Sequence, residues 1–140
     1  MYYSAYGKPK KVSNPLMDKM VVFAVDFLEI EEDIEIDFED DFEESAGWCS
    51  YDEGSITIGI NPTLSRTEIC KTLFHEMVHA KQYLRGDLIS GVGSKPSRWK
   101  GKYVIGINNY WDLPWEKEAY ETEAAMWDIF STQILTKRLR

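Results

Sequence analysis

The two histidines of the chain, His75 and His79, lie four residues apart and enclose Glu76 in an HExxH motif. On an α-helix, side chains four residues apart project in nearly the same direction, so both imidazoles can bind one metal ion. The motif is typical of zinc sites in which the glutamate acts on the water bound at the metal. Because the chain has only these two histidines, chance rarely produces this spacing beside a glutamate. We therefore expect His75 and His79 to bind Zn²⁺ and Glu76 to be the general base.

The motif lies in a segment that the sequence predicts to be helical. Ser65 and Glu68 have the spacing of a capping box, which begins a helix, and Arg85 and Gly86 form a basic last turn followed by a glycine stop. Between them, apolar residues recur at three- and four-residue steps and predict one buried stripe: Ile69, Leu73, Met77, Ala80 and Leu84.

A third protein ligand is needed to complete such a zinc site, and it must be a carboxylate or a cysteine because no third histidine exists. The best carboxylates lie in a second helical segment, for which Asp112 is a plausible N-cap and Pro114 fits the first turn. We expect this helix to run to about Leu139, with Glu116 near its start.

Other residues of the same segment are alternatives to Glu116. Glu121 and Glu118 are the next candidates for the third ligand, and Glu123 shares a helical face with Glu116 because the two are seven residues apart.

The arrangement resembles the gluzincin metalloproteases, especially their minimal single-domain members, in which HExxH on one helix is joined by a glutamate from a downstream helix. Glu116 and Ala119 match the Glu-x-x-Ala pattern of that second helix, whereas Tyr120 stands where an aspartate often orients a metal-binding histidine. Another carboxylate would then have to orient it. The resemblance implies a peptidase that hydrolyses peptide bonds with a metal-activated water and Glu76 as general base.

The implied fold is a small α+β zincin-like domain. In such a domain a short mixed or antiparallel sheet packs on the active-site helix, with an N-terminal helix and a long C-terminal helix that carries the third ligand.

A cysteine ligand defines one alternative function. Cys49 lies two residues after Gly47 in a predicted strand ahead of the motif. This arrangement is similar to peptide deformylase, although Val78 stands where that family has an aspartate. This would make the chain a zinc hydrolase of a formyl or other small acyl amide. A further alternative is a catalytically silent zinc-binding interaction module.

A donor for the oxyanion of the tetrahedral intermediate is also expected in a peptidase. Tyr110, Tyr120 and Arg98 are candidates, and we select Tyr110 because it lies just before the glutamate-bearing helix.

The remaining elements are predicted from hydrophobic periodicity. Apolar residues over 15–30 indicate an amphipathic helix, and the alternation over 34–38 indicates a strand with one wet face. Residues 47–60 predict a hairpin. The gluzincin resemblance implies that its second arm, Ser55–Ile60, is an exposed edge strand that pairs with an extended peptide or protein substrate. Residues 1–14 are predicted to be a loose basic arm.

Residues 86–112 are predicted to be mostly loop, with a cluster of cationic and aromatic residues from Arg98 to Tyr103. Such a cluster could bind nucleic acid. It is similar to SprT-like proteases, which act at DNA but normally use a third histidine that this chain lacks. A net charge of −8 argues against nucleic-acid affinity, so we interpret the cluster as a lysine-rich loop that balances an acidic domain.

The composition predicts one globular domain over residues 1–140. Two cysteines do not form a disulfide framework, and neither an apolar leader nor a membrane-spanning segment is evident. We therefore expect a cytoplasmic protein with no membrane partner; the sequence leaves its oligomeric state open.

Overall fold

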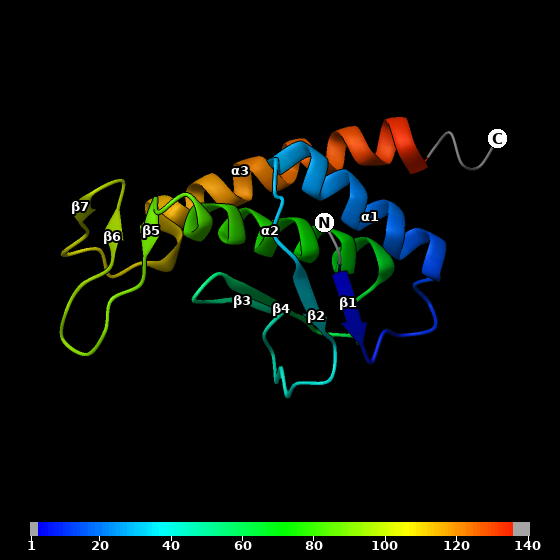
Figure 1. Cartoon of the computed structure of the whole chain (residues 1–140), viewed down its shortest axis with the longest axis horizontal. Helices are drawn as coiled ribbons and strands as arrows, with labels where there is room; N and C mark the ends of the chain where they lie inside the picture. Colours follow the sequence, from blue (N-terminus) through cyan, green and yellow to red (C-terminus); the bar gives the residue numbers. More distant parts are fainter. Residues whose placement is uncertain (1–2, 136–140) are drawn as a thin grey trace.

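The computed structural model describes residues 3–135 and shows an α+β fold, as the sequence predicts. Its main sheet has four strands in the order β1-β2-β4-β3 (Figure 1). The pairings β1–β2 and β2–β4 are parallel, and β3–β4 is the antiparallel hairpin. In chain order these strands are β1 Tyr3–Tyr6, β2 Ile34–Asp37, β3 Gly47–Asp52 and β4 Ser55–Ile60.

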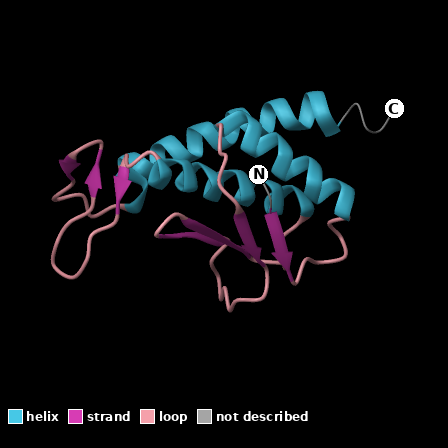
Figure 2. Cartoon of the chain, viewed as in Figure 1, coloured by secondary structure: helices cyan, strands magenta, loops and turns pink. Residues whose placement is uncertain are grey.

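One face of this sheet is covered by helices, as Figure 2 shows. The predicted N-terminal helix is α1, Asn14–Leu28, and the motif helix is α2, Arg66–Leu84. The long C-terminal helix is α3, Pro114–Ile129, which continues as a π-helix, η2, over Phe130–Leu135. Helix α2 contacts α1, α3, β3 and β4, so it is the central element of the fold.

The core lies between the sheet and the helices because the apolar residues of each element share one face. In β2 the buried residues alternate with more exposed ones, which is the period of a strand with one wet face. The same alternation holds over the first four residues of β4, whereas its last three residues are all buried. Phe130 packs against Phe23 and Phe74, with ring centroids 5.3 and 5.5 Å apart, and joins η2 to α1 and α2. Among the described residues, no helix combines the length and apolar character that crossing a membrane requires.

A second, antiparallel sheet lies beyond the end of α2 and the beginning of α3 (Figure 1). It consists of β5 Leu88–Ile89, β6 Arg98–Trp99 and β7 Lys102–Tyr103. The predicted loop is therefore partly ordered by strand pairing. A short 3₁₀-helix, η1 Tyr110–Asp112, then leads into α3.

The prediction of a loose arm over residues 1–14 is wrong for the part that the structure describes. Tyr3–Tyr6 forms β1, and Val12 is fully buried. The Lys8 ammonium group donates a hydrogen bond to the Val12 carbonyl, and the Tyr3 hydroxyl donates one to Asp18. A parallel strand such as β1 finds its partner only through a crossover, here α1, so no local turn signal announces it.

The prediction that Ser55–Ile60 is an exposed edge strand is also wrong. This strand is β4, and it pairs with β2 on one side and β3 on the other. Its main-chain groups are therefore engaged within the sheet. The edge strand on this side is β3, which pairs with no other strand in the described part of the chain.

The start of α3 differs from the prediction by one residue. Leu113 is the N-cap residue and makes no side-chain capping bond, whereas Asp112 belongs to η1. The Asn109 side chain instead accepts a hydrogen bond from the Trp111 amide and caps η1. Pro114 is in the first turn of α3 as predicted, and the predicted end at Leu139 lies outside the described residues.

Candidate metal centre

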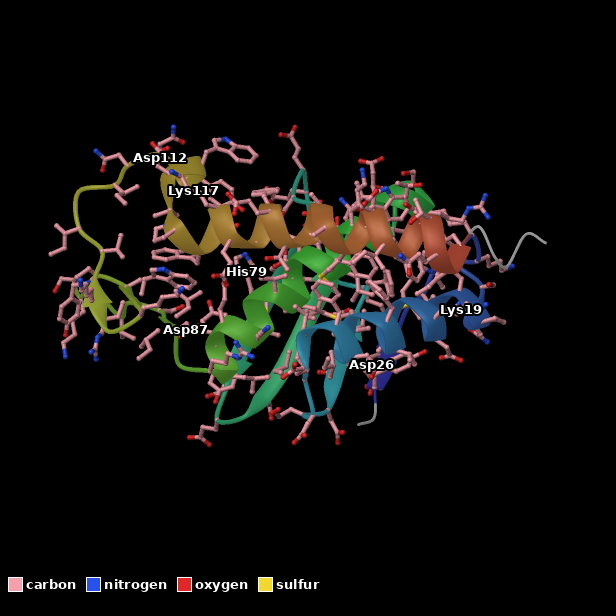
Figure 3. The ribbon with its side chains drawn as sticks, turned by 90° about the horizontal axis from the view of Figure 1, so that it is seen from above. Lys19, Asp26, His79, Asp87, Asp112 and Lys117 are labelled. Carbon is pink, nitrogen blue, oxygen red and sulfur yellow. The ribbon has the colours of Figure 1, made fainter. Side chains whose placement is uncertain are left out.

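Helix α2 carries the HExxH motif into the interior of the protein. Its start is fixed by the predicted capping box, in which Ser65 Oγ accepts from the Glu68 amide at 3.1 Å and donates to Glu68 Oε1 at 3.0 Å. The exposed fractions of His75, Glu76 and His79 are only 5, 8 and 7%. Figure 3 shows His79 between α2 and α3. Burying three polar side chains costs free energy unless hydrogen bonds, ion pairs or a metal ion compensate, so we expect partners for each of them.

Glu116 supplies the third group from the first turn of α3. Its carboxylate oxygens lie 3.0 Å from His75 Nε2 and 3.1 Å from His79 Nε2. One ligand atom from each of the three residues falls within 4.8 Å of the others, so His75, His79 and Glu116 could hold a metal ion together. The position of Glu116 near a helix N-terminus also stabilises its negative charge.

Each histidine is oriented by a second partner at its other ring nitrogen. His75 Nδ1 lies 3.0 Å from Glu123 Oε1, and His79 Nδ1 lies 2.8 Å from Gln82 Oε1. The Gln82 amide nitrogen donates to the Trp115 carbonyl at 3.0 Å, which fixes the amide orientation. An amide oxygen only accepts, so the proton of neutral His79 sits on Nδ1 and Nε2 is left as a lone-pair donor.

The electrostatics of the ligands follow from these contacts. Burial lowers the pKa of His75, but its hydrogen bonds to Glu116 and Glu123 outweigh burial and raise that pKa to about 9. Burial raises the pKa of Glu116, but the hydrogen bonds from the two histidines hold it well below its usual range. The site therefore keeps Glu116 as a carboxylate, the form that binds a cation.

Glu76 has the opposite environment. Burial raises the pKa of its carboxyl above the usual value, and the neighbouring histidines offset only part of this effect. A carboxylate with a raised pKa is a stronger base near neutral pH. Glu76 lines the same pocket as His79 and Glu116, and the volume of this pocket is 240 Å³. The other residues that line it are largely aromatic or small: Gly47, Trp48, Cys49, Tyr83, Leu88, Tyr110 and Trp115.

Gly47 lets the edge strand β3 approach α2 closely at this pocket. A Cβ atom at this position would lie 2.5 Å from the Gly59 carbonyl oxygen and 2.7 Å from Thr72 Cγ2. It would also lie 3.6 Å from Glu76 Cγ. Any larger residue would push β3 away from the candidate base.

The alternatives for the third ligand lie elsewhere or have other partners. Glu118 accepts a hydrogen bond from the Gln82 amide at 3.2 Å, and Glu121 is exposed. Cys49 lines the pocket but does not belong to the three-residue cluster found among the described residues. Burial, with the negative charge of Glu76, raises the pKa of the Cys49 thiol, which opposes the thiolate form that binds metals.

The three candidates for the oxyanion donor are placed differently. The Tyr110 hydroxyl donates to Glu116 Oε1 at 2.7 Å, so it lies in the pocket beside the cluster. The Tyr120 ring packs against the His75 ring, with centroids 4.3 Å apart. Arg98 is in β6, where its guanidinium lies over the Tyr103 ring.

Sequence reasoning missed Gln82 and Tyr83. Gln82 lies three residues after His79 on the same helix, and that spacing could have indicated a side-chain pair. Tyr83 lines the pocket and exchanges a hydrogen bond with Ser90 Oγ at 3.0 Å. Because Ser90 lies beyond the helix end, only the fold shows that pairing.

The helix-borne HExxH motif, the mixed sheet beneath it and the cluster with Glu116 together define a zincin-like domain. A model of the SprT-like family matches residues 18–92, more than half of the chain. The chain therefore belongs to the SprT-like family, and the resemblance to HExxH zinc metalloproteases is confirmed at this level. No curated protein and no solved structure shows a match to the chain. Glu116 lies outside the matched segment, so the family match does not cover the third member of the cluster.

Proposed function

We propose that the chain is a zinc-dependent metallopeptidase in which His75, His79 and Glu116 bind Zn²⁺ and Glu76 is the general base. The observation that carries this proposal is the convergence of two Nε2 atoms and one carboxylate in a buried site, with both Nδ1 atoms held by other side chains. Two histidines and one glutamate are a known catalytic zinc set, which leaves a coordination position open.

The donor chemistry fits zinc better than a harder cation. Imidazole nitrogens suit zinc and related transition metals, whereas Mg²⁺ and Ca²⁺ prefer oxygen ligands alone. A zinc ion bound here supplies Lewis acidity, which lowers the pKa of water and polarises a carbonyl group.

Two residues of the pocket would then act on the reacting groups, Glu76 by proton transfer and Tyr110 by a hydrogen bond. Glu76, with its raised pKa, accepts a proton from the attacking water and delivers it to the leaving amine nitrogen. Tyr110 has a hydroxyl within the pocket that can turn from Glu116 to the substrate carbonyl oxygen as negative charge develops there.

The substrate we propose is an extended peptide bound along β3, in place of the strand first predicted. The outer edge of β3 pairs with no strand in the described part of the chain, and Trp48 and Cys49 of this strand line the pocket. Main-chain hydrogen bonds to an edge strand give affinity with little dependence on sequence. We expect N-methylation of single substrate amides near the cleaved bond to lower cleavage for the same reason.

Substitution of Glu76→Gln tests the proposed function. The variant should retain one zinc ion per chain, measured by plasma mass spectrometry, but lose cleavage of an unfolded protein substrate. Glu121→Gln, which changes an exposed residue on α3, is the matched control and should keep both zinc and activity. Cleavage that survives in Glu76→Gln would refute Glu76 as the base. Turnover of a formylated peptide only at the formyl group would favour the amide-hydrolase alternative.

A further inference from the structure

A second cavity, larger than the one at the candidate metal centre, lies where the first turns of α1 and α2 meet the end of α3. Its volume is 750 Å³, which is within the range of about 300–1,000 Å³ typical of small-molecule sites. In Figure 3, α1 runs beside the C-terminal half of α3, and Phe23 of α1 contacts Phe130 of η2, which continues α3. The cavity is lined by Lys10, Lys11, Ser13, Leu16, Met20, Arg66, Thr67, Cys70, Trp127, Phe130 and Leu135.

The interior of this cavity is apolar. Met20, Cys70 and Phe130 are buried to 3% exposure or less and form its inner surface. Leu16 and Trp127 are partly buried and extend the same surface outward. A ligand that enters must therefore present a hydrocarbon-like portion, because this inner surface offers few hydrogen-bonding groups.

The rim of the cavity is cationic. Lys10, Lys11 and Arg66 are exposed and form no ion pair with any residue that the structure describes. No aspartate or glutamate is among the described lining residues, although the chain has a net charge of −8. Three cations without paired carboxylates favour an anionic group at the mouth.

We propose that this cavity binds a free amphipathic anion, namely a long-chain carboxylate whose hydrocarbon chain enters the apolar interior while its head group pairs with Lys10, Lys11 and Arg66. Charge argues against two other occupants of the cavity, the C-terminal residues of the chain itself and an anionic bilayer. The residues that follow Leu135 include Lys137, Arg138 and Arg140, which have the same sign as the rim. An anionic bilayer presents many negative charges to a protein whose net charge is −8, whereas a single carboxylate meets mainly the three cations of the rim.

The proposal is tested by titrating the full chain with dodecanoate below its micelle concentration in a calorimeter. We expect saturable binding of one dodecanoate per chain and no comparable binding of dodecyltrimethylammonium, which has the same chain length and the opposite charge. Lys10→Glu/Lys11→Glu should weaken dodecanoate binding about tenfold or more, because two attractions become repulsions. Lys95→Glu/Lys102→Glu, a matched pair near the small sheet, should leave the affinity unchanged.

Two further measurements locate the ligand. Thr67→Trp should block binding, because Thr67 is an exposed residue at the mouth and a larger side chain fills it. In a Cys49→Ser background, dodecanoate should slow the reaction of Cys70 with a thiol reagent, since Cys70 lies in the cavity wall. Equal binding of the cationic amphiphile, or no effect of the Lys10/Lys11 reversal, would overturn the proposal. Absence of binding to the full chain, or rim-dependent binding to anionic vesicles in place of free dodecanoate, would also overturn it.

Discussion

The carboxylate of Glu123 provides a direct test of the candidate metal centre. It does not contact the His75 nitrogen that would bind the metal, but it fixes the orientation of the His75 ring. Its Oε1 lies 3.0 Å from His75 Nδ1, on the opposite side of the ring from the Nε2 that faces Glu116. Glu123→Ala should leave His75 free to rotate or to change tautomer. Removing such an outer partner typically lowers metal affinity about 10- to 100-fold, which corresponds to about 1.4 to 2.7 kcal/mol of binding free energy.

The assay is a competition titration of zinc against a chromogenic chelator of known affinity. Glu123→Gln keeps an acceptor oxygen but loses the charge, so its zinc affinity should fall between those of the wild type and Glu123→Ala. Glu121→Ala removes an exposed carboxylate from the same helix and should bind zinc as the wild type does. If Glu123→Ala and Glu121→Ala have equal zinc affinities, the assigned orientation of His75 is wrong.

Four other substitutions test the fold that surrounds the site and the proposed oxyanion donor. Gly47→Ala forces a Cβ to within 2.5 Å of a backbone oxygen, so it should destabilise the protein by about 1–3 kcal/mol in urea denaturation and reduce cleavage. Phe130→Ala empties a fully buried ring position and should cost about 3–5 kcal/mol by the same measurement. Ser65→Ala removes the cap of α2 and should cost about 1 kcal/mol of unfolding free energy. Tyr110→Phe should retain zinc but lower kcat about 10²–10³-fold in peptide cleavage, and an unchanged kcat would exclude Tyr110 as the oxyanion donor.

The sequence predicted the elements whose signals are local. The capping box and the apolar stripe of α2 are both contained within one helix, so Ser65 could be identified as its start. The hairpin β3–β4 is announced by its turn, and the amphipathic period gives α1. The choice of Glu116 depended on the absence of a third histidine, on the helix signal that Pro114 provided and on the Glu-x-x-Ala pattern of the gluzincin resemblance.

Features that depend on distant contacts could not be predicted in the same way. The strand β1 and the internal position of β4 result from parallel pairing with β2, which no turn connects. A resemblance to other zincins therefore suggested the wrong edge strand. Gln82 was missed because an amide on a helix is usually solvated, and only the nearness of Trp115 on α3 shows that it is held against His79.

X-ray absorption spectroscopy of the zinc-loaded protein tests the central assignment most directly. If the proposed site is correct, we expect one zinc ion per chain, bound by two imidazole nitrogens and by oxygen ligands at about 2.0–2.2 Å. A sulfur ligand at about 2.3 Å would contradict this assignment and identify Cys49 as a ligand in place of Glu116. Failure of the chain to retain zinc would contradict the metal centre itself.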